Sequence, residues 1–545
     1  MQKLITYSLF IFFLLTGILI FKDYGISTDE DFHRLVGFYW LNYIANFFPG
    51  SDFLLDVQNK IKLIGDLTLS VESGATFKYY GVIFDLPLAF IETVFNITDP
   101  KKFFFLRHFL NFFLFWVSSV YFYKILIIRF KNWSLAIFGF LFYVLSPRIF
   151  AESFYNNKDL ILLSLFSISF YYVLIFFKKE NNLNSIKLGI ICAVCTSSRV
   201  LGILLIITCL LIYIFDLISL FKERIKSYNK YIILVFSYSI FLIIIWPYLW
   251  ENPFKNFFNT IKIFSNYLHI MQVLYNGEYY YSNKLPWHYS IVWPAITTPI
   301  LYIFFFILGF FFFIKRFLSR FVKIDNSNKR YSHLWVGYRE KFDVFLFFLL
   351  IIFYFLIIKL NATLYDGWRQ LYFIFPIIIY YAIYAIQIFY YYLKGKKYII
   401  NYLLTAYLTF LIYILYTMHP MQMVYFNFLA KNNVSINYQV DYWGLSSIQA
   451  IRKILNYEKN KSKVRIANAS YVSLWRSLVL LDKDDKNRIE FVGQDYKNAD
   501  YIFTNFNSEV NMRVNSKYNI PKNFQLVDTM YVNKIKVYDI YKKIK

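Results

Sequence analysis

Long apolar runs dominate the first 420 residues of this 545-residue chain. Many are close to the 20 or so residues that a helix needs to cross the hydrocarbon core of a bilayer. The pattern predicts about 11 spans, near 4–22, 103–128, 133–147, 160–177, 187–199, 200–221, 231–249, 290–314, 342–359, 371–392 and 399–418. Continuous apolar runs exclude a β-barrel, whose strands would alternate apolar and polar residues.

The distribution of basic residues between the loops predicts the orientation of these spans. If the N-terminus is cytoplasmic, the predicted inner loops hold 20 Lys and Arg residues and the short outer loops hold 8. This bias has the sign of the positive-inside rule. We therefore expect Lys3 inside, an uncleaved first span because no small-residue cleavage site follows it, and an extracytoplasmic C-terminal region.

Two regions differ from the apolar pattern. Residues 23–102 form a long first outer loop in which 31–48 and 79–97 predict helices lying at the membrane interface. From residue 420 short β-rich runs surround a helical stretch at 446–458. We predict a transmembrane domain over 1–419 and a small extracytoplasmic α/β domain over 420–545.

Composition agrees with a membrane protein and removes other classes. The chain is 58% hydrophobic and 17% charged, against about 25% charged in soluble domains. Its net charge of +25 follows from the basic inner loops, so nucleic acid is not an expected partner. Cys192 and Cys195 have C-x-x-C spacing, but no second Cys/His pair accompanies them, and we interpret them as packing residues.

The acidic run Asp29-Glu30-Asp31 is the main candidate for chemistry, because carboxylates beside a bilayer are costly unless water, a partner or a reaction compensates them. With an odd number of spans, the other unusual polar residues of the outer loops lie on the same face. They are His33, Arg34, Lys78, Tyr80, Arg107, Arg148, Lys158, Asp159, Arg199, Lys284, Trp287, His288, Asp366 and Arg369.

Acids, bases and aromatics on one membrane face suit a site for a polyprenyl-phosphate sugar. Cations would hold the lipid phosphate, aromatic rings would stack on the sugar, and one carboxylate would deprotonate the acceptor hydroxyl. The leaving phosphate needs no proton if Arg or Lys neutralises its charge.

The chain resembles the GT-C superfamily of membrane glycosyltransferases, and within it glycosyltransferase family 39, the protein O-mannosyltransferase and aminoarabinose transferase group. The resemblance runs through Asp29-Glu30, KYYGVIFDLPLAF at 78–90, Arg107, SPRIFAESFYNNKD at 146–159, KLPWHYSIVWPAITTP at 284–299 and LYDGWRQLYFIFP at 364–376. It implies a GT-C-like transmembrane fold, a polyprenyl-phosphate sugar donor, and catalysis by Asp29 with Glu30 beside it.

The resemblance implies no required cofactor. Asp29 and Asp31 are also similar to the metal-binding D-x-D of oligosaccharyltransferase relatives, and would be the ligands of Mg²⁺ or Mn²⁺ if the enzyme used a metal.

Two alternatives stay open: a flippase or transporter of lipid-linked glycans, and a glycan polymerase or ligase. The composition, rich in Phe, Ile, Lys, Asn and Tyr, suggests an AT-rich bacterial genome, so the expected location is a bacterial inner membrane. The sugar, the acceptor and the oligomeric state cannot be inferred from the sequence.

Overall fold

The computed structural model describes residues 1–544 except 65–75, 225–226, 266–268 and 323–333. Within these residues nine helices are long and apolar enough to cross a membrane, or ten if the bent pair α7–α8 counts as one span. The helices of this region are α1 (Gln2–Ile20), α6 (Pro100–Phe130), α7 (Trp133–Val144), α8 (Pro147–Tyr155), α9 (Asp159–Lys178), α10 (Asn182–Ser198), α11 (Ile203–Arg224), α12 (Tyr228–Ile245), α15 (Ile300–Val322), α16 (Gly337–Lys359), α17 (Phe375–Tyr392) and α18 (Lys397–Thr417). Each predicted span overlaps at least one helix.

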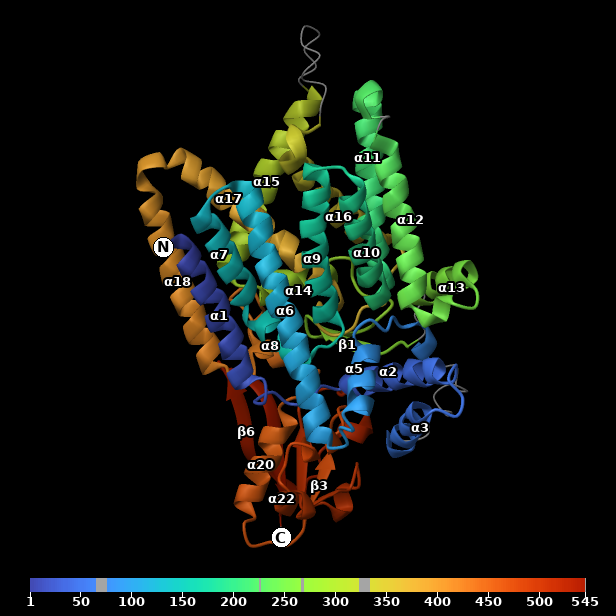
Figure 1. The fold of residues 1–545 in the computed structure, drawn as a ribbon. Coiled ribbons are helices and arrows are strands. Elements are labelled where there is room, and N and C mark those ends of the chain that lie inside the picture. Colours follow the sequence, from blue (N-terminus) through green and yellow to red (C-terminus); the bar gives the residue numbers. More distant parts are fainter. Residues whose placement is uncertain (65–75, 225–226, 266–268, 323–333, 545) are drawn as a thin grey trace.

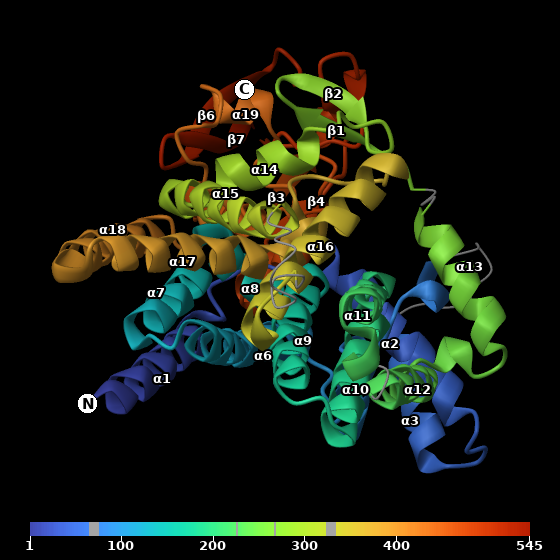
Figure 2. The same ribbon diagram turned by 90° about the horizontal axis from the view of Figure 1, so that it is seen from above.

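The helices form two outer groups with a third group between them. Seen from above, α1, α7 and α18 lie on one side and α10, α11 and α12 on the other, with α6, α9 and α16 between them (Figure 2). The central helix α9 is the most enclosed of the three, with 83% of its apolar window buried, whereas α1 and α12 are each 22% buried. We infer that α1 and α12 face lipid.

Two prolines interrupt helices of the bundle. α7 and α8 meet at an angle of 61°, with Pro147 opening α8. The predicted span 290–314 is also divided, into α14 (Tyr289–Thr297) and α15, with Pro299 in the break. Ser146 and Thr298 both have extended backbone, as expected for residues that precede a proline. The single helix predicted here was therefore wrong.

The first outer loop contains the two expected helices, α2 (Glu30–Ala45) and α5 (Asp85–Val94), and a third, α3 (Asp52–Ile64), that we did not predict. α2 lies crosswise to the long helices (Figure 1). Gly37 permits the close approach of α2 to α5, because a Cβ there would lie 2.4 Å from the Asp85 carbonyl oxygen. This contact fixes the start of α2 near the start of α5.

The C-terminal region is an α/β domain at one end of the bundle (Figure 1). Its sheet has the order β4-β3-β5-β7-β6, in which β3 is parallel to β4 and β5 and the other pairs are antiparallel. The elements are α19 (Val434–Asn437), α20 (Ser447–Tyr457), β3 (Val464–Asn468), α21 (Trp475–Leu478), α22 (Lys483–Asn487), β4 (Ile489–Phe491), β5 (Tyr501–Thr504), β6 (Phe524–Val532) and β7 (Ile535–Lys543). The predicted fold class, a multi-pass helical membrane protein with a small C-terminal α/β domain, is confirmed.

The large outer loop contains a helix, α13 (Pro253–Ser265), and a hairpin that we did not predict. Strands β1 (Gln272–Tyr275) and β2 (Glu278–Tyr281) are joined by Asn276-Gly277, whose φ angles are +55° and +89°. An Asn-Gly pair between two short runs is a strong hairpin signal, since both turn positions need positive φ. The backbone N–H of Gln272 donates to the Glu509 carbonyl at 3.1 Å, which ties the hairpin to the C-terminal domain.

Candidate active site

Three consecutive carboxylates begin α2, where the helix dipole favours negative charge. Successive helical residues point about 100° apart, so the three side chains reach different partners. Asp29 Oδ2 lies 2.6 Å from Arg369 Nη1, Glu30 Oε2 lies 3.0 Å from His108 Nε2, and Asp31 Oδ2 lies 2.5 Å from Arg476 Nε. The exposed fractions of these side chains are 39%, 0% and 23%, which makes Asp29 the most accessible carboxylate of the three.

The structure corrects the expectation that Glu30 acts beside Asp29. The Glu30 carboxylate is fully buried, accepts the Ser27 backbone N–H at 2.6 Å and pairs with His108. It links the start of α2 to α6 and is turned away from the accessible side of Asp29. We therefore assign Glu30 a positioning role.

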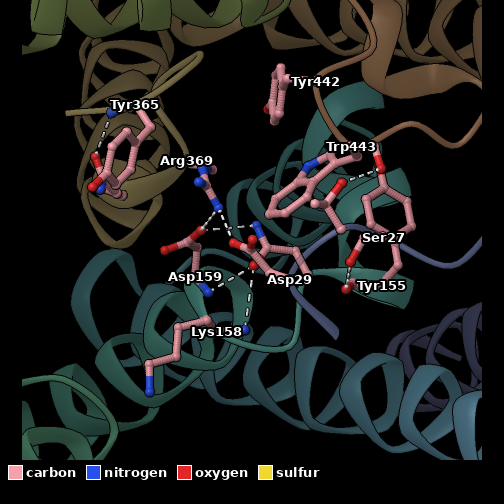
Figure 3. A network of polar contacts seen from close by, with 12 residues as sticks. Ser27, Asp29, Tyr155, Lys158, Asp159, Tyr365, Arg369, Tyr442 and Trp443 are labelled. Carbon is pink, nitrogen blue, oxygen red and sulfur yellow. Dashed lines mark hydrogen bonds and ion pairs between the residues drawn. The ribbon is translucent and has the colours of Figure 1, made fainter. Parts of the chain in front are cut away.

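Arg369 is the cation that contacts Asp29 (Figure 3). It begins the short helix η5 (Arg369–Ile374), and its guanidinium lies 4.6 Å from the centre of the Trp443 ring. Its Nη1 atom is also 3.9 Å from Asp159 Oδ2. Asp159 Oδ1 in turn lies 2.6 Å from Arg199 Nη2. Arg369 and Arg199 thus surround Asp159, and Arg369 bridges it to Asp29.

Lys158 is a buried cation without a direct carboxylate partner among the described residues. Its side chain is 5% exposed, and its Nζ atom lies 3.4 Å from the Gly81 carbonyl oxygen and 4.7 Å from the centre of the Tyr80 ring. Burial lowers the pKa of Lys158 to about 8, although the nearby Asp85 opposes this shift. An ammonium has three N–H donors, so Lys158 retains donor capacity for an anion.

His33 lies in the same positive surroundings. Burial lowers its pKa well below the usual value, and Lys158, Arg199 and Arg369 lower it further. His33 Nδ1 is 3.9 Å from Asp85 Oδ2, and its ring packs edge-on against Tyr80. A neutral imidazole at this place can still donate or accept one hydrogen bond at each nitrogen.

Two predicted substrate-binding arginines are instead held by carboxylates of α5. Arg107 contacts Asp85 at 3.3 Å and Glu92 at 3.0 Å, and Arg34 contacts Glu92 at 2.8 Å. Burial raises the pKa of Asp85 to about 6 against the effect of Arg107. Both guanidiniums serve these ion pairs, so Arg34 and Arg107 fix α2, α5 and α6 together. Their role in substrate binding stays a prediction.

A second polar cluster lies around Glu152 of α8. Glu152 Oε1 accepts hydrogen bonds from the Tyr372 hydroxyl at 2.6 Å and the Tyr442 hydroxyl at 2.9 Å, and Oε2 accepts from Asn156 Nδ2 at 2.7 Å. Asn156 Nδ2 also lies 3.2 Å from Asp159 Oδ2. Arg148 is fully buried, and its Nη1 atom donates to the Tyr442 hydroxyl at 3.4 Å. The predicted residue Arg148 is therefore linked to Glu152 through Tyr442.

Five predicted residues make no hydrogen bond or ion pair with Asp29, Lys158 or Arg369 within the described ranges. His288 Nδ1 is 2.8 Å from the Tyr275 hydroxyl, and Trp287 is 65% exposed. Lys78 lies over Tyr79, Lys284 lies in the loop between β2 and α14, and Asp366 is buried near Gln439. Four of them lie in the two long outer loops, where membership of a loop is a weak guide to position.

Sequence reasoning missed Glu152, Asn156, Trp443 and Arg476. The first two lie inside the segment at 146–159 that we quoted, and the Asn before a helix start was a usable signal, since Asn156 Oδ1 accepts the Asp159 N–H at 2.9 Å. Trp443 lies in the segment between α19 and α20. Arg476 had no local signal.

Asp29 and Asp31, considered above as ligands of Mg²⁺ or Mn²⁺, contact different partners. In the described part of the chain no three His, Cys, Asp or Glu residues come close enough to hold a metal ion. Asp29 and Asp31 are each paired with a different arginine. Metal dependence therefore stays a prediction, and we derive no step through a metal.

Comparisons with known proteins return structural neighbours. No family model matches the sequence, and no curated protein sequence matches it. The apo oligosaccharyltransferase of Archaeoglobus fulgidus is similar with a TM-score of 0.47 and 10% identity, over 91% of this chain and 69% of that one. ArnT from Cupriavidus metallidurans, solved with undecaprenyl phosphate, is similar with a TM-score of 0.43 and 10% identity, over 98% of this chain and 97% of that one.

Proposed function

We propose that this integral membrane protein is an inverting GT-C-type glycosyltransferase, which moves one sugar from a polyprenyl-phosphate donor to an acceptor on the extracytoplasmic face. The observation that carries the proposal is the contact of the accessible Asp29 with Arg369, next to Asp159 and Arg199, whose charges also act on the buried Lys158. A base and a set of phosphate-binding cations are the two parts that this reaction needs.

The charges of the cluster fit a sugar-phosphate diester. Lys158, Arg199 and Arg369 supply three positive charges. Asp29 and Asp159 supply two negative ones. The excess positive charge matches the single negative charge of a diester between a polyprenol and a sugar. When the sugar leaves, a second negative charge develops on the phosphate, and hydrogen bonds from charged donors are well suited to stabilise it.

The reaction follows as a single displacement. Arg369 contacts only Oδ2 of Asp29, so Oδ1 is available to accept the proton of an acceptor hydroxyl. The hydroxyl oxygen bonds to the anomeric carbon while the bond from that carbon to the phosphate oxygen breaks. The electron pair stays on the polyprenyl phosphate, where Lys158, Arg199 and Arg369 neutralise it. Attack opposite the leaving group inverts the anomeric carbon.

The distribution of charge supports an outward-facing site. Helix α2, which directly follows Asp29, lies at the end of the bundle that carries the C-terminal domain (Figure 1). Arg369 contacts Asp29 at this place (Figure 3). The loops 129–132 and 178–187 lie at the other ends of α6 and α9, and belong to the set with most of the basic residues. By the positive-inside rule, the site and the C-terminal domain would be extracytoplasmic and the N-terminus cytoplasmic. The acceptor would then also be extracytoplasmic. In a bacterium this would be the inner membrane.

The transporter alternative would require charged groups along a path through the spans. Two buried ion-pair clusters do occur in the bundle, Arg129–Asp343–Arg316 and Lys341–Asp216. Each links the ends of neighbouring helices remote from Asp29, and their close contacts of 2.5 to 2.8 Å are those of structural ties. We favour the enzyme over the transporter for this reason.

Transfer and transport differ in what happens to the donor. The purified full-length protein is reconstituted in liposomes containing radiolabelled undecaprenyl-phosphate sugars, and an envelope extract is added as acceptor. The proposal expects the donor to be consumed and label to appear in a new product. Relocation of intact donor between leaflets, without consumption, would instead identify a flippase.

A further inference from the structure

The sheet of the C-terminal domain has a topological switch point. β3 is flanked by two parallel strands, β4 and β5. The chain leaves β3 toward β4 at one edge and leaves β5 toward β6 at the other edge. Open α/β sheets bind their ligands outside the carboxyl ends of the strands at such a switch point.

Both loops at this switch point contact the region of the proposed site. In the loop after β3, the Tyr471 N–H donates to the Asn507 carbonyl at 2.8 Å in the loop after β5. Asn507 Nδ2 donates to the Tyr442 carbonyl at 3.2 Å, one residue before the indole that lies under Arg369. Thr28 Oγ1 donates to the Trp443 carbonyl at 3.0 Å, immediately before Asp29.

Two aromatic side chains that follow β3 remain accessible, Tyr471 in the loop and Trp475 at the start of α21. Tyr471 is 43% exposed and Trp475 is 45% exposed. The residue after Trp475 is Arg476, which pairs with Asp31, two positions from Asp29. Burial raises the pKa of Tyr471, and the negative charges of Glu509 and Asp29 raise it further, which places its hydroxyl within electrostatic reach of both carboxylates.

We propose that the surface around Tyr471 and Trp475, at the carboxyl end of β3, binds the acceptor. The acceptor is a saccharide whose ring stacks on these two side chains, and one of its hydroxyl groups reaches Asp29. This inference rests on the proposed function and deepens it. The acceptor oxygen bonds to the anomeric carbon, its proton passes to Asp29, and polyprenyl phosphate leaves. Tyr and Trp offer an apolar face together with a polar group, which suits a sugar ring with its apolar face and its hydroxyls.

The sheet edges argue against a peptide acceptor. Arg476 and Lys517 are paired with Asp31 at 2.5 Å and Glu509 at 2.9 Å, and Arg513, in the loop after β5, is exposed. An extended peptide commonly adds to a free strand at the edge of a sheet. β3 and β5 are interior strands, so a peptide at their carboxyl ends would find no free strand to pair with.

The test uses the purified full-length protein in nanodiscs with radiolabelled undecaprenyl-phosphate sugars. The acceptor probes are the polysaccharide, lipid and protein fractions of an envelope from cells that lack this protein. The variants are Tyr471→Ala, Trp475→Ala, and the ring-preserving Tyr471→Phe and Trp475→Phe. Tyr531→Ala is the matched control, because Tyr531 is 63% exposed on β6, away from the switch point. Binding of undecaprenyl phosphate is measured for every variant.

We expect label in the polysaccharide fraction. Each alanine variant should raise the KM for that fraction by about 10-fold, the size of a lost aromatic contact, with kcat and undecaprenyl phosphate binding little changed. The Phe variants and Tyr531→Ala should behave as the wild type. Label in the lipid or protein fraction, or alanine variants with a wild-type KM, would overturn the saccharide inference while leaving glycosyl transfer intact. A wild type that leaves the donor intact with all three fractions would overturn the proposed function, and this inference with it.

Discussion

Asp29 and Arg369 are 340 positions apart in the chain, yet their side chains meet at 2.6 Å. Asp29 directly precedes helix α2 of the first outer loop, and Arg369 begins η5 of the last short outer loop. The same guanidinium is within 3.9 Å of Asp159. Arg369 therefore joins the carboxylate that would accept the proton to the cations that would hold the phosphate.

Removing the bridging arginine should impair the chemical step. Arg369→Ala should lower kcat by about 10²- to 10³-fold, as for other single donors to a developing anion. Arg369→Lys keeps the charge but has a single donor centre, and should retain part of the activity. The measurement is single-turnover transfer from a radiolabelled donor. Wild-type rates in the alanine variant would contradict this role.

Neutralising Lys158 should weaken binding of the lipid phosphate. The pKa of about 8 means that the free protein loses this positive charge as pH rises through 8, so affinity for undecaprenyl phosphate should fall between pH 7 and pH 9. Lys158→Met should bind weakly and show less of this pH dependence. The measurement is ligand-induced thermal stabilisation, with the exposed Lys483→Met as control. Equal binding by Lys158→Met and the wild type would remove Lys158 from the phosphate site.

The structure explains which parts of the site were predictable. The residues next to the ends of predicted spans were predictable, namely Asp29, Lys158, Asp159 and Arg369. The predicted number and order of the spans placed all four on the same face of the membrane. The role of Glu30 could not be predicted, because one residue along a helix changes the direction of the side chain by about 100°. The spans predicted the bundle, and short β-rich runs predicted the sheet.

Docking of the C-terminal domain could not be predicted. The contact between Asp31 and Arg476 spans 445 positions and joins two elements with no shared local pattern. Trp443 and Tyr442 likewise acquire their places only when the linker before α20 packs against α8 and η5. Pattern and charge describe single elements well, whereas contacts across domains depend on the packed fold.

Asp366 should make the protein less stable as pH rises. Burial raises its pKa to about 7, against about 3.9 in an unfolded chain, so between these values the folded state binds the extra proton. Stability from this group is then present at pH 4 and declines toward pH 7. Asp366→Asn, which stays neutral, should flatten this decline. The measurement is the difference in Tm between pH 5 and pH 8 for both proteins, and identical differences would contradict the shift.

Gly444 should tolerate no side chain. Its φ is +75°, and a Cβ there would lie 2.0 Å from Val472 Cγ1 in the loop that carries Tyr471. Gly444→Ala should therefore destabilise the C-terminal domain by about 1–3 kcal/mol, from backbone strain and overpacking together. Val472→Ala in the same chain should restore part of the loss, because it removes the clash but not the strain. The measurement is chemical unfolding, and no rescue would show that the clash is absent.

The identity of the base is tested most directly by Asp29→Asn, which keeps the size of the side chain and removes its ability to accept the proton. Transfer from a radiolabelled polyprenyl-phosphate sugar is measured under single-turnover conditions, with membrane insertion and undecaprenyl phosphate binding as controls for folding. We predict a loss of about 10²- to 10⁴-fold in the transfer rate with both controls intact. A transfer rate equal to that of the wild type would contradict the account.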